Sequence, residues 1–122
     1  MCSSDLNNTA VGYQSLYSNT TGTPNTALGY TALRTNTTGN YNTASGWQAM
    51  YNNTTGSSNT AFGSNALVNN TTANGSSAFG YQSLQNNTTG DRNHSFGMGS
   101  LATNTTGSFN TDRKSTRLNS SH

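Results

Sequence analysis

The sequence predicts an all-β fold, a parallel β-solenoid (β-roll) in which each coil is one 17-residue repeat. The first observation behind this prediction is a period of 17 residues that runs from Asn8 to Thr111 without an insertion or a deletion. The second is that the segments between recurring glycines are too short for an ordinary globular helix. These segments are also rich in Thr, Tyr, Phe, Leu and Val, which favour short strands. One structural unit stacked on copies of itself accounts for all of these features.

We number the repeat from position 1 at Asn8 to position 17 at Pro24. The six full coils begin at Asn8, Asn25, Asn42, Asn59, Ser76 and Asn93, and a seventh begins at Asn110. Six coils stacked at the strand spacing of ~4.8 Å give a rod that is roughly 29 Å long.

Two glycine positions in each repeat indicate two corners in each coil, because glycine adopts backbone angles that other residues resist. At position 15 the residue is glycine in every coil except one, which has Ala73. Either this corner tolerates a right-handed backbone angle, or Gly75 provides the turn instead. The invariant corner glycines at position 5 are Gly12, Gly29, Gly46, Gly63, Gly80 and Gly97.

Apolar residues recur at positions 3, 4 and 9, and we expect them to face the interior of the rod. This core is thin, so the rod needs further support from hydrogen-bonded side-chain columns or from association of several chains. The large side chains at position 6, from Tyr13 onward, are the candidates for such a contact between chains. The predicted core consists of Ala10, Val11, Leu16, Ala27, Leu28, Leu33, Ala44, Met50, Ala61, Phe62, Leu67, Ala78, Phe79, Leu84, Phe96 and Leu101.

Each coil carries Asn-Thr-Thr at positions 12 to 14, and this triplet has three interpretations. It is an acceptor sequence for N-glycosylation. It is also suited to a ladder of amides and hydroxyls that closes the coil, which we favour. The third interpretation is an ice-binding face, which requires the position 13 threonines to point outward, although adjacent strand residues face opposite ways. The candidate glycosylation or ladder residues are Asn19, Asn36, Asn53, Asn70, Asn87 and Asn104.

Disorder is the competing structural prediction, because Asn, Thr, Ser and Gly dominate the chain. A disordered spacer has no reason to keep Leu or Met at every seventeenth residue, so the in-register apolar positions favour a folded solenoid.

The ends of the chain differ from the repeat. Residues 1–6 and 112–122 can both be encoded by sequencing-library adapter, one stretch being the reverse complement of the other. We therefore expect non-native flanks at 1–6 and 112–122, with the second disordered, around an internal piece of a longer gene at 7–111. Cys2 then says nothing about the redox compartment.

The repeat region contains few charged or potentially catalytic side chains. Its charged residues are Arg34, Asp91 and Arg92, a net charge of +1 (two positive, one negative), which argues against nucleic acid as a partner. No apolar run approaches the length of a membrane span. Asp91 and His94 occur in one coil only, which favours loop variation over a catalytic or metal site. We expect no enzyme activity and no cofactor.

Two segments of the repeat resemble a known family. Asn8-Thr-Ala-Val-Gly-Tyr-Gln-Ser-Leu16 and Asn25-Thr-Ala-Leu-Gly-Tyr-Thr-Ala-Leu33 resemble the repeats of bacterial and phage tail-fibre-domain proteins. More loosely, they are similar to the head repeats of trimeric autotransporter adhesins, which form a trimeric left-handed parallel β-roll. The adhesin repeat is shorter and lacks the Asn-Thr-Thr-Gly block. The resemblance covers all of 7–111 and implies a left-handed homotrimer on a cell or virion surface.

From these observations we expect a structural, surface-display segment of an adhesin or tail fibre, which is extracellular and self-associates as a homotrimer or fibre. Its stacked coils would present Asn, Thr, Gln and Tyr rows to glycans or cell surfaces. The alternatives are an ice- or polysaccharide-binding solenoid and an N-glycosylated extracellular filament.

Overall fold

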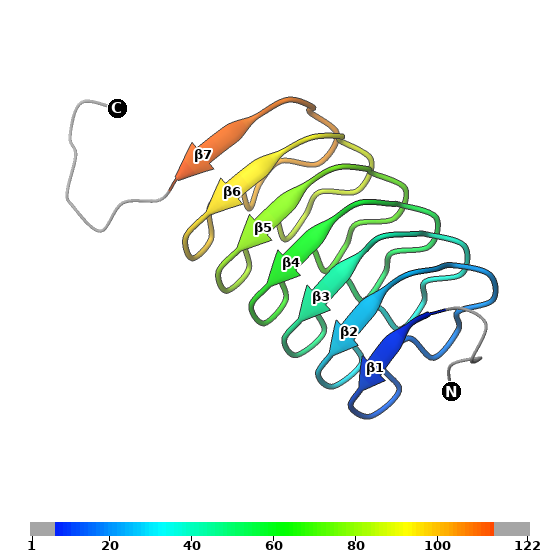
Figure 1. The fold of residues 1–122 in the computed structure, drawn as a ribbon. Helices are drawn as coiled ribbons and strands as arrows, with labels where there is room; N and C mark the ends of the chain where they lie inside the picture. Colours follow the sequence, from blue (N-terminus) through cyan, green and yellow to red (C-terminus); the bar gives the residue numbers. More distant parts are fainter. Residues whose placement is uncertain (1–6, 114–122) are drawn as a thin grey trace, which may run out of the picture.

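The computed structural model describes residues 7–113 and confirms the parallel β-solenoid (Figure 1). Seven strands of three residues each lie side by side in one parallel sheet, in chain order. The register is one repeat, so that Thr9 pairs with Thr26 and Ala10 with Ala27, and the same offset holds through the sheet. The strands are β1 (Thr9–Val11), β2 (Thr26–Leu28), β3 (Thr43–Ser45), β4 (Thr60–Phe62), β5 (Ser77–Phe79), β6 (His94–Phe96) and β7 (Thr111–Arg113).

β7 extends two residues past the repeat boundary that the sequence indicates. Asp112 pairs with Ser95, and Arg113 pairs with Phe96. Parallel pairing uses backbone groups, so these residues need no repeat-like side chains to continue the ladder. For Asp112 and Arg113 the predicted disorder is therefore wrong, whereas 1–6 and 114–122 lie outside the described residues.

After the strand, each coil returns through three overlapping turns. In the second coil, the N–H of Ala32 donates to the Gly29 carbonyl (3.3 Å) and the N–H of Arg34 to the Thr31 carbonyl (3.3 Å), while the N–H of Asn36 donates to the Leu33 carbonyl (3.2 Å). The φ angles of Thr31 and Leu33 are +54° and +52°. Positive φ at the third residue of a turn is the signature of type II geometry. Leu or Met keeps this left-handed angle in every coil because its side chain must point inward.

The corner glycines at position 5 adopt φ between +117° and +136°, a region that only glycine occupies readily. A Cβ on Gly29 would also lie 2.7 Å from the carbonyl oxygen of Gly46, which is backbone and cannot move aside. Both the angle and the close approach of successive coils therefore require glycine, and the prediction of a corner here is confirmed.

The second corner, at position 15, uses an ordinary backbone angle. Its glycines have no positive φ, so Ala73 fits there and is fully buried. Gly75 has φ of +70°, but it does not replace a position 15 glycine. It follows the rule for position 17, where non-glycine residues also have positive φ: Tyr41, Ser58, Arg92 and Phe109.

The interior of the rod contains the side chains of positions 3, 8 and 9. Leu33, Met50, Leu67 and Leu84 at position 9 are all fully buried, as the sequence predicts. Alanines at positions 3 and 8 face one another across the thin core: Ala27, Ala44, Ala61 and Ala78 against Ala32, Ala49 and Ala66. Ala10 and Leu101, in the terminal coils, are partly buried against this cluster.

The assignment of position 4 to the core is wrong. Val11 is 62% exposed and Phe62 is 42% exposed, although the alanine one residue earlier in β4 is fully buried. Side chains of a strand alternate between its faces, so an inward position 3 forces position 4 outward. The residues corrected in this way are Val11, Leu28, Phe62, Phe79 and Phe96.

Three of the polar substitutions inside the core occur together. Ser95 replaces the alanine of position 3, while Ser83 and Ser100 stand at position 8. The hydroxyls of Ser83 and Ser95 lie 2.7 Å apart, and Ser95 donates to the Ser100 carbonyl (2.7 Å). Because these hydroxyls satisfy one another, the sixth coil keeps its shape without the alanine pair.

Candidate functional site

The asparagines at position 12 form a continuous ladder inside the rod. Asn53 donates from Nδ2 to the Oδ1 of Asn36 (2.7 Å) and to the carbonyl of Gly56 (3.0 Å), while its own Oδ1 accepts from Asn70 (2.7 Å). Asn36, Asn53, Asn70 and Asn87 are fully buried. The ladder interpretation is therefore confirmed for this position, and a glycan on a buried Nδ2 has no space in the folded coil.

A second amide ladder, at position 1, was not anticipated from the sequence. The Oδ1 of Asn25 accepts the backbone N–H of Asn42 (2.8 Å), and its Nδ2 donates to the Gly39 carbonyl across the same coil (2.8 Å). The asparagines of the two ladders fill the part of the coil interior that the small apolar core does not occupy. Of the buried side-chain polar atoms in residues 7–113, the Oγ1 of Thr23 has no hydrogen-bond partner.

The threonine rows serve the same purpose on the outside. At position 13, Thr37 donates its hydroxyl to the carbonyl of Thr54 in the next coil (3.2 Å), and Thr54 donates to Thr71 in the same way (3.2 Å). The position 14 threonines, such as Thr38, are exposed. The Thr-Thr pair therefore has one hydroxyl bonded to the rod and one in solvent, rather than a uniform outward row at position 13.

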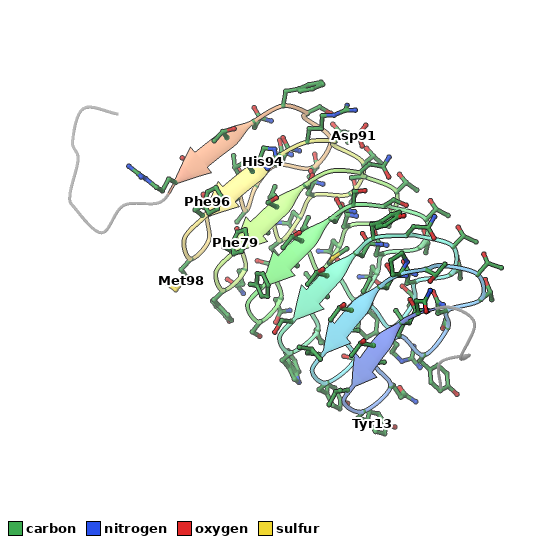
Figure 2. All side chains as sticks on the ribbon, in the orientation of Figure 1. Tyr13, Phe79, Asp91, His94, Phe96 and Met98 are labelled. Carbon is green, nitrogen blue, oxygen red and sulfur yellow. The ribbon has the colours of Figure 1, made fainter. Side chains whose placement is uncertain are left out.

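Asp91 and His94 do not form a joint site. In Figure 2 Asp91 lies in the loop that precedes β6, and His94 lies on β6 itself. Asp91 accepts the backbone N–H of Asn74 (2.8 Å), which repeats a bond that Asn40 and Asn74 make elsewhere at position 16. Among the described residues, no three side chains of metal-binding type come together.

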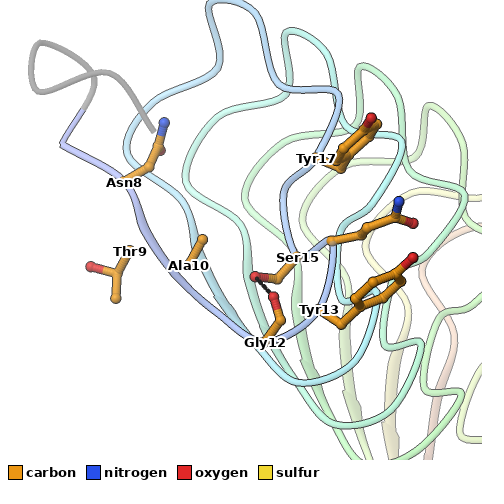
Figure 3. A pocket seen from close by; sticks show the side chains of 8 residues that line it. Asn8, Thr9, Ala10, Gly12, Tyr13, Ser15 and Tyr17 are labelled. Carbon is orange, nitrogen blue, oxygen red and sulfur yellow. Dashed lines mark hydrogen bonds between the residues drawn. The ribbon is translucent and has the colours of Figure 1, made fainter. Parts of the chain in front are cut away.

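Figure 3 shows a hollow at the first coil, lined by the inner surface of residues from Asn8 to Tyr17. Ala10 and Ser15 point into it, and the Ser15 hydroxyl donates to the Gly12 carbonyl (3.1 Å). The same inner surface recurs in every coil, where the neighbouring coil covers it. The hollow is therefore the cross-section of the rod at the point where the described residues begin, rather than a built ligand site.

The outward rows are where the coils differ from one another. One row, which we call the apolar edge, comprises the apolar side chains of position 4: Val11, Leu28, Phe62, Phe79 and Phe96. Its phenylalanine rings stack from coil to coil, with centroids 5.2 Å apart for Phe62–Phe79 and for Phe79–Phe96. Four of these five side chains are 39–62% exposed, so the rod presents a line of apolar groups to solvent.

The first three coils carry a different surface, which we call the aromatic face: Tyr13, Tyr17, Tyr30, Arg34, Trp47 and Tyr51. The position 6 rings stack, with centroids 5.3 Å apart for Tyr13–Tyr30 and 6.1 Å for Tyr30–Trp47. In Figure 3, Tyr13 and Tyr17 both project to the side of the coil away from Thr9. Sequence reasoning identified the rings of position 6 and missed those of position 10. The only signal at position 10 was that the first three coils have tyrosine or arginine where the later coils have Val, Gln and Ala.

Comparison with models of protein families, with curated proteins and with solved structures finds no match to this chain. The part of the chain that the structure describes contains no helix that could cross a membrane.

Proposed function

We propose that this chain is a rod-like segment of a surface fibre or adhesin, located outside the cell or on a virion, which carries out no catalysis and acts by displaying side chains at fixed spacing. The observation that carries this proposal is the difference between the inward and the outward positions of each repeat. Inward positions are almost uniform and fully bonded, whereas outward positions 4, 6, 10 and 17 vary freely from coil to coil. Such a scaffold is suited to presenting a surface rather than to holding a reactive centre.

The apolar edge supports self-association as a homotrimer. Four of its five side chains leave about 40–60% of their area in solvent, which amounts to roughly 400 Å² if a large side chain buries about 150–250 Å². This lies within the range of the largest apolar patches of soluble monomers and is about half of what each partner buries in a standard interface. The occupant we propose is a second and third copy of this chain, aligned coil to coil.

The repeat supplies its own conservative variants for a test. Ser45 stands at position 4 of the third coil, so replacing Phe62, Phe79 and Phe96 together by Ser keeps a residue that the coil accepts. The control is Tyr41→Ser, because Tyr41 is 67% exposed at position 17, where the next coil has Ser58. Sedimentation equilibrium should show a trimer for the parent chain and the control, and a monomer for the triple variant. A parent chain that stays monomeric at about 100 µM would refute the assembly.

The other functions predicted from the triplet have less support. The ice-binding face predicted at position 13 has less support, because those hydroxyls are engaged with backbone carbonyls and the exposed threonine row lies at position 14 instead. A filament glycosylated at position 12 needs exposed amides, but those amides form the buried ladder. Binding of polysaccharide is favoured by a separate observation, developed next.

A further inference from the structure

The side chain of Arg34 contacts residues of the coil before and of the coil after its own. Its guanidinium carbon lies 5.2 Å from the ring centroid of Tyr17 in the coil before and 5.8 Å from that of Tyr51 in the coil after. Its Nε donates to the Oε1 of Gln14 (2.8 Å), and Nη1 reaches the hydroxyl of Tyr51 (3.5 Å). Two rings and an amide therefore fix the plane of the guanidinium, which leaves one Nη1 donor and both Nη2 donors without a partner among residues 7–113.

The charge of Arg34 has no counter-charge within residues 7–113. The described carboxylates are Asp91, which accepts the N–H of Asn74, and Asp112, which bonds to the Ser100 hydroxyl. Both lie in later coils. A fixed, partly exposed guanidinium with free donors is the group that proteins use to hold a carboxylate in two parallel hydrogen bonds.

The surroundings of Arg34 indicate what carries that carboxylate. Tyr13, Tyr30 and Trp47 are 46–62% exposed and form a parallel row beside the position 10 row, with Gln14 reaching across to Arg34. Flat rings in rows pack well against the C–H faces of sugar rings, and amide and hydroxyl groups between them can meet sugar hydroxyls. Of the strands in these three coils, β2 and β3 are paired on both sides, so an extended peptide could pair only along the edge of β1.

We propose that the aromatic face binds an acidic glycan, with Arg34 holding the carboxylate of a uronic or sialic acid residue and the aromatic rows packing against neighbouring sugars. The inference deepens the proposed display function and rests on it. Three coils span about 10 Å at the strand spacing, which suits a short stretch of sugars along the rod. Later coils replace the face by Ser64, Val68, Gln85 and Ala102, so one site of this kind exists in residues 7–113.

The test uses the fluorescence of Trp47, which is the single tryptophan of the chain and belongs to the proposed site. The full chain is titrated with pentagalacturonate and with 3′-sialyllactose, and with galactopentaose and lactose as their neutral counterparts. We expect at least one acidic probe to bind about tenfold or more tightly than its neutral counterpart. Preference for pentagalacturonate points to an acidic polymer, and preference for sialyllactose to a terminal sialic acid. A pentaglutamate peptide that binds as tightly as the best glycan would overturn the proposal in favour of a peptide partner.

Two variants and a matched control locate the site. Arg34→Gln should weaken the acidic probe about tenfold or more without affecting neutral sugars, because a charge-assisted bidentate pair is lost. Tyr30→Ser, which introduces the residue type that the fourth coil has at Ser64, should weaken all sugars. The control Arg92→Gln removes the same charge from another arginine that lies over a ring, Phe109 at 5.5 Å, and should bind like the parent. Equal loss in Arg34→Gln and Arg92→Gln, or no binding of either acidic probe, would refute the proposal.

Sedimentation of the same samples separates the two proposals. Trimers that bind no acidic glycan would overturn only the glycan site. Monomers that bind it would overturn only the assembly along the apolar edge.

Discussion

Replacing Gly63 by alanine should be among the most damaging single changes in this rod. Gly63 has φ of +128°, where a non-glycine residue costs of order 1–3 kcal/mol. A Cβ there would lie 2.7 Å from the carbonyl carbon and oxygen of Gly80, so the two coils must separate locally. That separation weakens the bonds from the N–H of Gly80 to Phe62 (2.7 Å) and from the N–H of Gln82 to Ser64 (3.0 Å).

Each weakened bond contributes about 1 kcal/mol, so the total loss should be about 3–5 kcal/mol. The control is Gly99→Ala. Gly99 also has a positive φ, +68°, but a Cβ there meets nothing within 4 Å. Its replacement should cost only the left-handed strain of about 1–2 kcal/mol.

Urea unfolding at 25 °C, followed by far-ultraviolet circular dichroism and by Trp47 fluorescence, measures both losses. Because coils of a solenoid contact only their neighbours, Gly63→Ala should also broaden the transition by uncoupling the two halves of the rod. Losses for Gly63→Ala and Gly99→Ala that agree within about 0.5 kcal/mol would show that close approach of the coils does not dictate the corner glycine.

Three further predictions concern the interior and the ladder. Asn53→Asp should destabilise the rod by about 3 kcal/mol or more at neutral pH, because it buries a carboxylate opposite two acceptors, whereas Asn86→Asp loses one solvent-exposed bond to the Ala102 carbonyl and should cost about 1 kcal/mol or less. The Asn53→Asp loss should shrink as the pH falls, since a protonated carboxyl can donate again, and urea unfolding at pH 4 and pH 7 tests this. Leu67→Ala should cost about 2–5 kcal/mol by thermal or urea unfolding, but Val11→Ala less than about 0.5 kcal/mol, and similar costs would contradict the corrected core. If the chain is secreted from a glycosylating host, peptide mass spectrometry should find glycans at exposed acceptor sequences such as Asn86-Asn-Thr and not at buried Asn53; a folded rod modified at Asn53 would refute the ladder.

The choice of which apolar residues face inward could have been better predicted from the sequence than it was. Position 3 is nearly always alanine and position 4 is larger and more variable, which made both appear to be core residues. Strand alternation allows only one of two adjacent positions to point inward, and the narrow coil accepts the smaller one. The bulkier side chains at position 4, Phe62 among them, therefore lie outside, where they form the apolar edge.

The asparagine ladders show the opposite case, in which sequence reasoning has too little to work with. Asparagine is usually exposed, but Asn53 is buried because amides of the same residue type stand one coil away on either side. Asn25 is buried because the Asn42 N–H and the Gly39 carbonyl satisfy its amide. At position 12 the recurring Asn-Thr-Thr motif indicated a possible ladder, but at position 1 no local signal distinguished a ladder from a loop residue. The fixed orientation of Arg34 is of the same kind, because Tyr17 and Tyr51 are each 17 residues away.

By itself, the sequence determined the quantities that repeat: the 17-residue coil, the register that places each residue beside its counterpart, the position 5 corner and the buried position 9 side chain. A strict period fixes these because every coil must fit the next in the same way. Only the tertiary structure decided which outward residues come together, in the apolar edge and the aromatic face. Those surfaces depend on side-chain direction and on stacking between coils, and neither exists until the coils are in contact.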